Sequence, residues 1–258
     1  MSADFELEPV PDEPAAAGAW RLITTWGADP AFNMGLDEAL LLSTDSPPTL
    51  RFYTWNPDTL SLGYFQRFDD VVGTDRAGAV VRRITGGGAI HHVRELTFSL
   101  TAPEDHCVFA GPIPESYKRV HAAIQRALKE LGIEAELRGD GALTSDREDT
   151  GMCFHESTEL DIAWGAKKGV GSAQRRKDGR VLHHGSIKLG SSPLEGSIAT
   201  IGEHTPDASP ETLAPLLRRA LAEELDLTFT VGVPGPDERE SARELGRRYL
   251  DPEFVRRR

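Results

Sequence analysis

The stretch from residue 159 to 189 constrains the fold most, because it predicts three strands in succession with no helix between them. The three runs are ELDIAW (159–164), GVGSAQRR (169–176) and RVLHHGSIKL (180–189). The sequence KDG at 177–179 predicts a hairpin turn between the last two runs. A doubly wound parallel sheet needs a helix between successive strands, so this pattern favours a mixed or antiparallel sheet.

The remaining chain adds further strands, several of them in succession, and helices. TLRFYTW (49–55) alternates in polarity, with Leu50 and Phe52 on one face and Arg51 and Tyr53 on the other. Further strands are predicted at 59–65, 78–84 and 95–101, and amphipathic helices at 114–132, 209–225 and 237–250. A short helix with Asn33 as its N-cap ends before Pro47. We therefore expect an α/β (α+β) fold with a central mixed β-sheet flanked by helices.

Composition and charge exclude several classes of protein. The chain has 258 residues, 39% of them hydrophobic, and no apolar run long enough to span a membrane. Residues 1–18 lack the basic and apolar regions of a secretory signal, so we expect a disordered acidic leader. Two cysteines make no disulfide framework, and we expect a cytoplasmic protein. The net charge of −12 argues against general nucleic-acid binding.

Basic residues nevertheless form local clusters on this acidic chain. The clusters are Arg82-Arg83, Lys167-Lys168, Arg175-Arg176-Lys177 and Arg256 to Arg258. Each cluster can be read as solvated surface or as a basic face for an acidic protein partner. Both interpretations stay open at the level of sequence.

Three consecutive glycines occur in RRITGGGAIHH, residues 82–92. The run matches neither the dinucleotide-binding fingerprint nor the phosphate-binding P-loop. It can form a simple turn, or it can supply bare backbone that a ligand approaches closely. Arginines beside exposed backbone amides could hold a carboxylate or phosphate, or steer an acidic partner.

Several motifs together identify a family. RRITGGGAIHH followed by ELTFSL resembles the signature of the biotin/lipoate A/B group, which contains lipoate–protein ligases and octanoyltransferases. FNMGLDEALL, LRFYTWNPDTLSLGYFQ, KKGVGSAQRR and LHHGSI resemble further family motifs in the same order. The resemblance spans roughly residues 20 to 205 and implies a class II biotin-synthetase-like sheet. It also implies that residues 19–258 form a single catalytic domain.

The resemblance further implies an acyl tunnel beside the glycine loop. A buried acyl chain would gain about 0.8 kcal/mol per methylene, which favours binding by several kcal/mol. His92 and His184 would form hydrogen bonds around this tunnel or position the donor. The expected substrate-binding residues are Arg82, Arg83, Thr85, Gly86, Gly87, Gly88, Ala89, His92, Gly171, Ser172, Ala173, His184, Gly185 and Ser186.

Cys153 and Lys168 are the expected catalytic residues. Cys153 matches the nucleophile of the cysteine-dependent octanoyltransferase branch, and a thiolate requires a nearby cation, for which the family lysine Lys168 is the candidate. A cysteine beside a phenylalanine is also commonly a small buried hydrophobe. Cys107 lies outside every matched motif. We expect no metal site at the histidine pairs, because adjacent histidines on a strand face opposite ways.

The leading interpretation is an octanoyltransferase that moves octanoyl from acyl carrier protein, through a thioester on Cys153, to a lysine of a lipoyl-accepting protein. The acceptor would be the glycine-cleavage H protein or a dehydrogenase lipoyl domain. This reaction needs no cofactor. The alternatives are an ATP- and Mg-dependent lipoate ligase without its accessory domain, an amidotransferase, and a non-catalytic acyl-binding relative. We expect a monomer that binds neither nucleic acid nor membrane.

Overall fold

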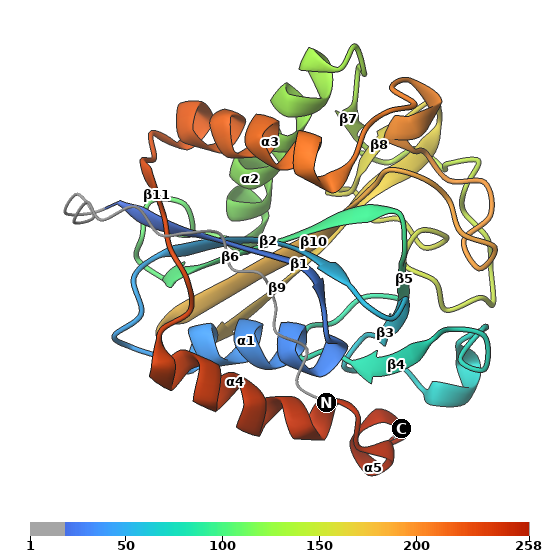
Figure 1. Cartoon of the computed structure of the whole chain (residues 1–258). Helices are drawn as coiled ribbons and strands as arrows, with labels where there is room; N and C mark the ends of the chain where they lie inside the picture. Colours follow the sequence, from blue (N-terminus) through green and yellow to red (C-terminus); the bar gives the residue numbers. More distant parts are fainter. Residues whose placement is uncertain (1–18, 258) are drawn as a thin grey trace.

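The computed structural model describes residues 19–257, and a mixed eight-stranded sheet forms its centre (Figure 1). The order of strands is β11-β1-β2-β6-β10-β9-β8-β7. These strands are β1 (Trp20–Ala28), β2 (Thr49–Trp55), β6 (Glu95–Pro103), β7 (Glu136–Leu137), β8 (Ile162–Trp164), β9 (Lys167–Lys177), β10 (Arg180–Lys188) and β11 (Phe229–Val231). The predicted leader, residues 1–18, lies outside the described residues.

The sheet is mixed because its two ends are built differently. β1 pairs parallel with β2 and β11, whereas β2, β6, β10, β9, β8 and β7 follow one another antiparallel. The hairpin between β9 and β10 turns at Asp178 and Gly179, whose φ angles are 51° and 76°. Two consecutive positive φ angles are typical of a two-residue type I′ turn. The predicted mixed sheet and its hairpin are confirmed, and β1 is a strand that the sequence patterns did not predict.

A second, smaller sheet carries the glycine triplet at its end. It has three strands in the order β4-β3-β5, namely β3 (Thr59–Leu62), β4 (Ala79–Arg82) and β5 (Ile90–His92). The loop of residues 83–89 joins β4 to β5, so the triplet lies between two strands of this sheet rather than before a helix.

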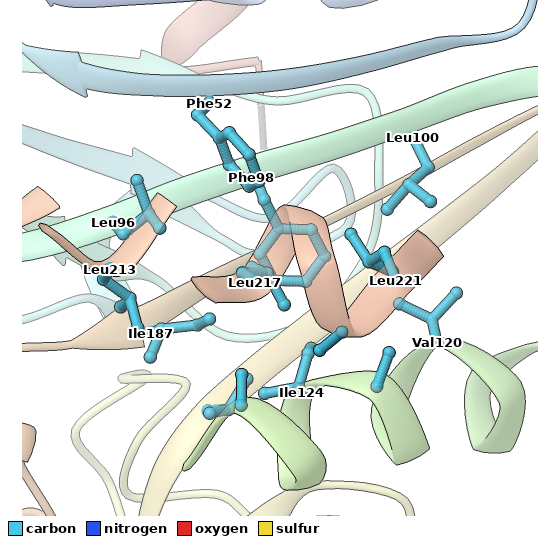
Figure 2. Close-up of a cluster of buried hydrophobic side chains, with 14 of the residues drawn as sticks. Phe52, Leu96, Phe98, Leu100, Val120, Ile124, Ile187, Leu213, Leu217 and Leu221 are labelled. Carbon is cyan, nitrogen blue, oxygen red and sulfur yellow. The ribbon is translucent and has the colours of Figure 1, made fainter. Parts of the chain in front are cut away.

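Helices cover both faces of the large sheet (Figure 1). They are α1 (Pro30–Leu42), α2 (Ile113–Glu130), α3 (Pro210–Leu225), α4 (Pro236–Tyr249) and α5 (Pro252–Val255). Helices α2 and α3 pack on one face, where Phe98 and Leu100 of β6 meet Leu217 of α3 and Ile124 of α2 (Figure 2). Each such buried side chain contributes roughly 1.5–3 kcal/mol. No helix within residues 19–257 is long and apolar enough to cross a membrane.

Helix α1 begins four residues earlier than predicted. Its N-cap is Asp29, whose carboxylate accepts hydrogen bonds from the backbone amides of Ala31 and Phe32. Asn33, predicted as the N-cap, instead lies buried in the first turn, and its amide donates to the Thr54 carbonyl at 3.1 Å. The prediction was wrong because Asp29 stands before Pro30, and proline is favoured in the first helical turn.

The opposite face of the sheet, under α1, is polar instead of apolar. Asp37 of α1 is buried there between Arg51 and Tyr53 of β2 and Ser99 of β6, each within hydrogen-bond distance. Burial alone would raise the pKa of Asp37, but Arg51 and His184 outweigh it and lower that pKa. The Asp37 carboxylate therefore stays ionised where α1 meets the sheet. Helix α4 packs on the outer side of α1 (Figure 1).

The contact between α1 and α4 depends on glycine. A Cβ on Gly35 would lie 2.1 Å from the Ala242 carbonyl oxygen of α4. We predict that Gly35→Ala lowers the free energy of unfolding by about 1–3 kcal/mol through overpacking, measured by urea denaturation. Gly141→Ala is the matched control, because no atom lies within 4 Å of its Cβ position. Equal stability of the two variants would contradict this account of the helix contact.

Six histidines are buried in the described structure, and burial strongly disfavours protonation of three of them. Desolvation lowers the pKa of His92 and of His121 to about 4, and lowers the pKa of His183 well below its usual value. Unfolded histidines titrate near about 6.5. As the pH falls below that value, the unfolded chain therefore takes up protons that the folded chain does not.

We predict that acidification from pH 6.5 to 4 destabilises the fold progressively. The protons of these three histidines alone correspond to a slope of up to about 4 kcal/mol per pH unit, and burial also lowers the pKa of His106 and His155, which adds to the slope. Urea titrations at several pH values should give this slope, and His121→Asn should reduce it by up to about 1.4 kcal/mol per pH unit, the share of one proton. His204, which is exposed, supplies the control variant His204→Asn. A slope that His121→Asn leaves unchanged would contradict the assignment.

Candidate active site

A pocket with about 400 Å³ of empty space, open solvent at its mouth included, lies on the α1 side of the sheet. Eight of the residues expected from the sequence line it, namely Arg83, Gly87, His92, Cys153, Ser172, Ala173, His184 and Gly185. Six further residues that the sequence analysis missed complete the wall, namely Met34, Tyr53, Trp55, Ser61, Ile90 and Thr97. Tyr53 and Trp55 share the face of β2 that carries Arg51, so strand alternation could have placed them here.

The Cys153 thiol and the Lys168 ammonium meet at this pocket. Lys168 Nζ lies 3.3 Å from Cys153 Sγ and 2.8 Å from a carboxylate oxygen of Asp161. It also donates to the Cys153 carbonyl at 2.7 Å. All three side chains are buried. Burial alone would lower the pKa of Lys168, but Cys153 and Asp161 outweigh it and raise that pKa, so the ammonium form persists.

A β-bulge directs Lys168 toward Cys153. Ile162 pairs with Val170, whereas the next residue of β8, Ala163, pairs with Lys168, which leaves Gly169 as the extra residue of β9. A bulge shifts the alternation of side chains along a strand. A Cβ on Gly169 would lie 2.0 Å from the Trp164 indole, so this ring occupies the space that a side chain would need.

Two of the three glycines of the loop have a structural reason, because Gly87 adopts a φ of 89° and Gly88 touches another backbone segment. A Cβ on Gly88 would lie 2.7 Å from the Cys153 nitrogen, and a Cβ on Gly63 would lie 1.9 Å from the Gly87 carbonyl oxygen. Ala89 exchanges hydrogen bonds of 2.7 Å with this segment, accepting from Cys153 N and donating to the Gly151 carbonyl. Gly87 alone of the triplet lines the pocket, while Gly86 faces the Phe65 ring.

Arg82 and Arg83 are structural, so for this cluster both interpretations, solvated surface and basic face for a partner, were wrong. Both side chains are buried. Arg82 donates to the carbonyls of Gly63 and Val255, at 2.8 and 2.7 Å, which ties the C-terminal segment to the small sheet. Arg83 donates to the carbonyls of Gly86 and Gly88, both at 2.7 Å, and so fixes the loop. Guanidinium groups occupied by backbone carbonyls cannot meet a protein partner.

The predicted cluster at 175–177 is divided by strand alternation. Arg176 lies on the α2 side of the sheet, where it forms an ion pair with Glu104 at 2.7 Å and donates to the Phe109 carbonyl at 3.1 Å. Arg175 and Lys177 point to the opposite face. Only these two of the three are therefore oriented toward the side on which the pocket lies.

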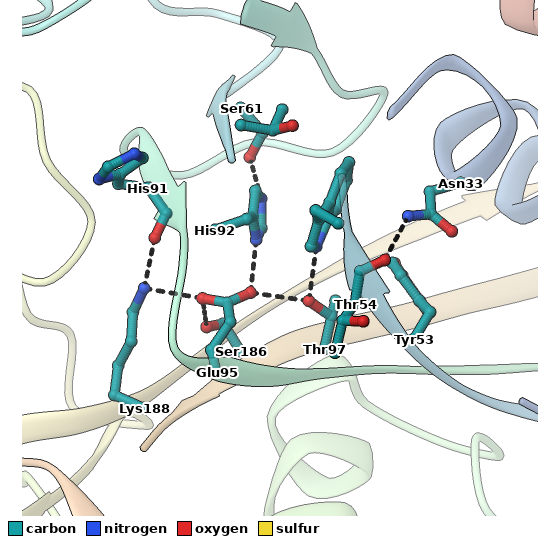
Figure 3. A network of polar contacts seen from close by, with 12 residues as sticks. Asn33, Tyr53, Thr54, Ser61, His91, His92, Glu95, Thr97, Ser186 and Lys188 are labelled. Atoms are coloured by element: carbon teal, nitrogen blue, oxygen red, sulfur yellow. Dashed lines mark hydrogen bonds and ion pairs between the residues drawn. The ribbon is translucent and has the colours of Figure 1, made fainter. Parts of the chain in front are cut away.

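Two histidines of the pocket wall are held by hydrogen bonds at both ring nitrogens. His184 Nδ1 donates to Asp37 at 3.2 Å, and its Nε2 accepts from the Thr85 hydroxyl at 2.7 Å. His92 contacts Glu95 through Nδ1 at 2.5 Å and Ser61 through Nε2 at 2.7 Å (Figure 3). Ring nitrogens that are both occupied orient the wall and are not available to a metal ion.

Behind His92 lies a buried charged network (Figure 3). Glu95 also accepts from the Ser186 hydroxyl and from Lys188 Nζ, the latter at 2.7 Å, and Lys188 lies 2.9 Å from Glu195. Burial alone would lower the pKa of Lys188, but Glu195 and Glu95 outweigh it and raise that pKa. Ser186 therefore supports the wall from behind rather than lining it.

Gly171, another of the expected substrate-binding residues, lies beside Cys153. Gly171 borders the reactive pair, since a Cβ there would lie 3.1 Å from Cys153 Sγ. Cys107 is exposed and lines a separate hollow with Arg119. Among residues 19–257, no three histidine, cysteine or acidic side chains gather in a way that could hold a metal ion. The arrangement offers a thiol beside a fixed cation at the end of a pocket, which suits acyl transfer through sulfur.

Comparisons with known proteins show the family of the chain. The sequence model of the lipoyl protein ligase A/B catalytic domain matches residues 29–207. Octanoyltransferase LipM of Moorella thermoacetica is 43% identical, over 67% of this chain and 66% of that protein. The LipM proteins of Kyrpidia tusciae and Clostridioides difficile are 34% and 31% identical, over 91% and 93% of this chain and 97% and 99% of their own lengths.

Solved structures share the fold. Protein Ta0514 of T. acidophilum with bound lipoic acid is 25% identical and matches with a TM-score of 0.78, over 93% of this chain and 100% of that chain. Lipoate-protein ligase A bound with ATP is 24% identical and matches with a TM-score of 0.75, over 92% and 98%. The predicted fold class is confirmed. The chain belongs to the family of lipoyl protein ligase A/B catalytic domains.

Proposed function

We propose that this chain is an octanoyl-[acyl-carrier-protein]:protein octanoyltransferase of lipoate biosynthesis. The observation that carries the proposal is the 3.3 Å contact between Cys153 Sγ and Lys168 Nζ at the end of the pocket. The full-length relatives named octanoyltransferases support the same acyl group and the same acyltransferase class.

In the first step, the Cys153 thiolate attacks the carbonyl carbon of an octanoyl thioester on acyl carrier protein. A bond forms between Cys153 Sγ and this carbon, and the carrier sulfur leaves as a thiolate with its electron pair. The Lys168 ammonium, held by Asp161, stabilises the thiolate before attack and the charge on oxygen after it. One thioester replaces another, so the step is nearly balanced in free energy.

In the second step, the amine of an acceptor lysine attacks the enzyme thioester. An amide bond forms, the Cys153 thiolate departs, and the amine proton passes to solvent or to a nearby base. An amide is more stable than a thioester, so this step drives transfer forward. The acceptor is a lipoyl-accepting protein such as the glycine-cleavage H protein or a dehydrogenase lipoyl domain.

The pocket suits a medium acyl chain more than a polar substrate. Met34, Trp55 and Ile90 contribute apolar wall, while the polar side chains of the wall are engaged with one another. At about 0.8 kcal/mol per buried methylene, an octanoyl chain contributes several kcal/mol of binding. Because the donor is already a thioester, the proposed reaction needs no ATP, metal or other cofactor.

We predict that octanoyl-acyl carrier protein acylates the enzyme without ATP. Mass spectrometry should show one added octanoyl group that hydroxylamine removes, because hydroxylamine cleaves thioesters. Cys153→Ala should abolish the adduct, whereas Cys107→Ala, the matched control at an exposed thiol, should keep it. Acylation that requires ATP and free octanoate would refute the transferase proposal in favour of a ligase.

We predict that Lys168→Met slows formation of the acyl-enzyme by about 10²–10³-fold, because one charge-stabilising group is lost. Rapid-quench measurement of octanoyl-Cys153 provides the rate. Lys167→Met serves as the control, since Lys167 is only partly buried and forms no contact with Cys153 among the described residues. Similar rates for both variants would show that Lys168 has no role in the transfer.

A further inference from the structure

A cationic groove lies between β9, α4 and the C-terminal segment, and it plays no part in the site described above. Its empty space is about 540 Å³, open solvent at its mouth included. It is lined by four cations, one carboxylate and four apolar or aromatic side chains, namely Arg175 and Lys177 of β9, Arg248 of α4, Arg257, Glu38, Leu41, Tyr64, Ile84 and Phe254. Four cations converge there on a chain whose net charge is −12.

The charges of the cationic groove are mostly uncompensated. Arg248 is paired with Glu38 at 2.5 Å, but Arg175, Lys177 and Arg257 form no ion pair with any residue in the 19–257 range. Two of these guanidinium groups approach one ring, since Arg257 Cζ lies 3.7 Å and Arg175 Cζ 5.7 Å from the centre of Tyr64. Both guanidinium groups are therefore placed around one ring, where a bound anion would be attracted to each of them.

Strand β9 connects the cationic groove to the reactive cysteine. Alternate residues of a strand point to the same face. Gly171 borders Cys153 Sγ, Ala173 lines the acyl pocket, and Arg175 and Lys177 line the groove. The six residue steps from Gly171 to Lys177, at a rise of about 3.3 Å each, span about 20 Å along the strand. On this face of β9, Ala173 is therefore the last residue that lines the acyl pocket and Arg175 is the first that lines the groove.

The chemistry of the donor matches this layout. A carrier-protein thioester is the end of a long linear arm whose other end is a phosphodiester attached to the protein. With the octanoyl chain in the pocket and its carbonyl at Cys153, the arm must leave along an open surface. Guanidinium groups bind phosphate oxygens in pairs and with defined geometry, and they do so more strongly than neutral donors.

We propose that the cationic groove binds the phosphodiester of the donor's phosphopantetheine arm, through Arg175 and Arg257 with Lys177 beside them. The arm then lies along β9 between Ala173 and the groove. This assignment rests on the proposed octanoyltransferase activity, and it places the donor on the side of the pocket that faces α4 and the C-terminal segment.

The test compares two small donors that differ only in the phosphate, octanoyl-phosphopantetheine and octanoyl-pantetheine. The wild-type enzyme should acylate Cys153 with a kcat/KM about tenfold higher for the phosphorylated donor, as expected for a charge-assisted contact. Arg175→Gln combined with Arg257→Gln should remove this preference and leave the rate with octanoyl-pantetheine unchanged. Arg218→Gln, at an exposed arginine of α3, is the matched control.

A binding measurement separates this proposal from the proposed function. Calorimetric titration of the Cys153→Ala protein with phosphopantetheine alone requires no turnover, and the double variant should weaken binding about tenfold. Binding that the double variant leaves intact would overturn the proposal. A loss of activity confined to the intact carrier protein as donor would also overturn it, because the arginines would then recognise acidic protein side chains.

The absence of acylation by every thioester would refute the proposed function. Loss of phosphopantetheine binding in the double variant would still support the groove in that case.

Discussion

The buried ammonium of Lys168 is the charge on which the candidate site depends. An unpaired ammonium in a protein interior is costly, so its position is fixed by the groups that compensate it. Asp161 supplies a carboxylate at 2.8 Å and the Cys153 segment supplies a carbonyl and a sulfur. The bulge at Gly169 then becomes necessary, because only a shifted alternation brings Lys168 to the face where Cys153 lies.

The backbone around Cys153 depends in turn on the absence of side chains. Gly88 lets the cysteine segment approach the loop, Gly63 lets the loop approach the small sheet, and Ala89 pairs with Cys153 through its backbone. Arg83 fixes the glycine loop by donating hydrogen bonds to the carbonyls of Gly86 and Gly88. The thiol therefore sits on a segment whose position is determined by backbone contacts, which preorganises it without a rigid secondary-structure element.

Much of the fold followed from local patterns, because alternation and helical periodicity report the environment of each side chain. The strands around Phe52, Phe98 and Val170 and the three long helices lay where these patterns predicted. Strand β1 did not, since its sequence carries no clear alternation and its place between two parallel neighbours depends on distant pairing. The direction of Arg82 and Arg83 was also beyond local reasoning, because a charged pair looks the same whether it meets solvent or buried carbonyls.

The sequence by itself determined the family, the reactive residue types and the chemical character of the pocket, because these depend on which side chains occur in order along the chain. Tertiary structure alone decided that Cys153 and Lys168 meet at 3.3 Å and that Arg176 turns away from Arg175. It also decided that Gly88 packs against the backbone of Cys153, whereas Gly86 faces the Phe65 ring. The reason is physical: distances between segments far apart in sequence are set by packing, bulges and the satisfaction of buried polar groups, none of which leaves a local signal.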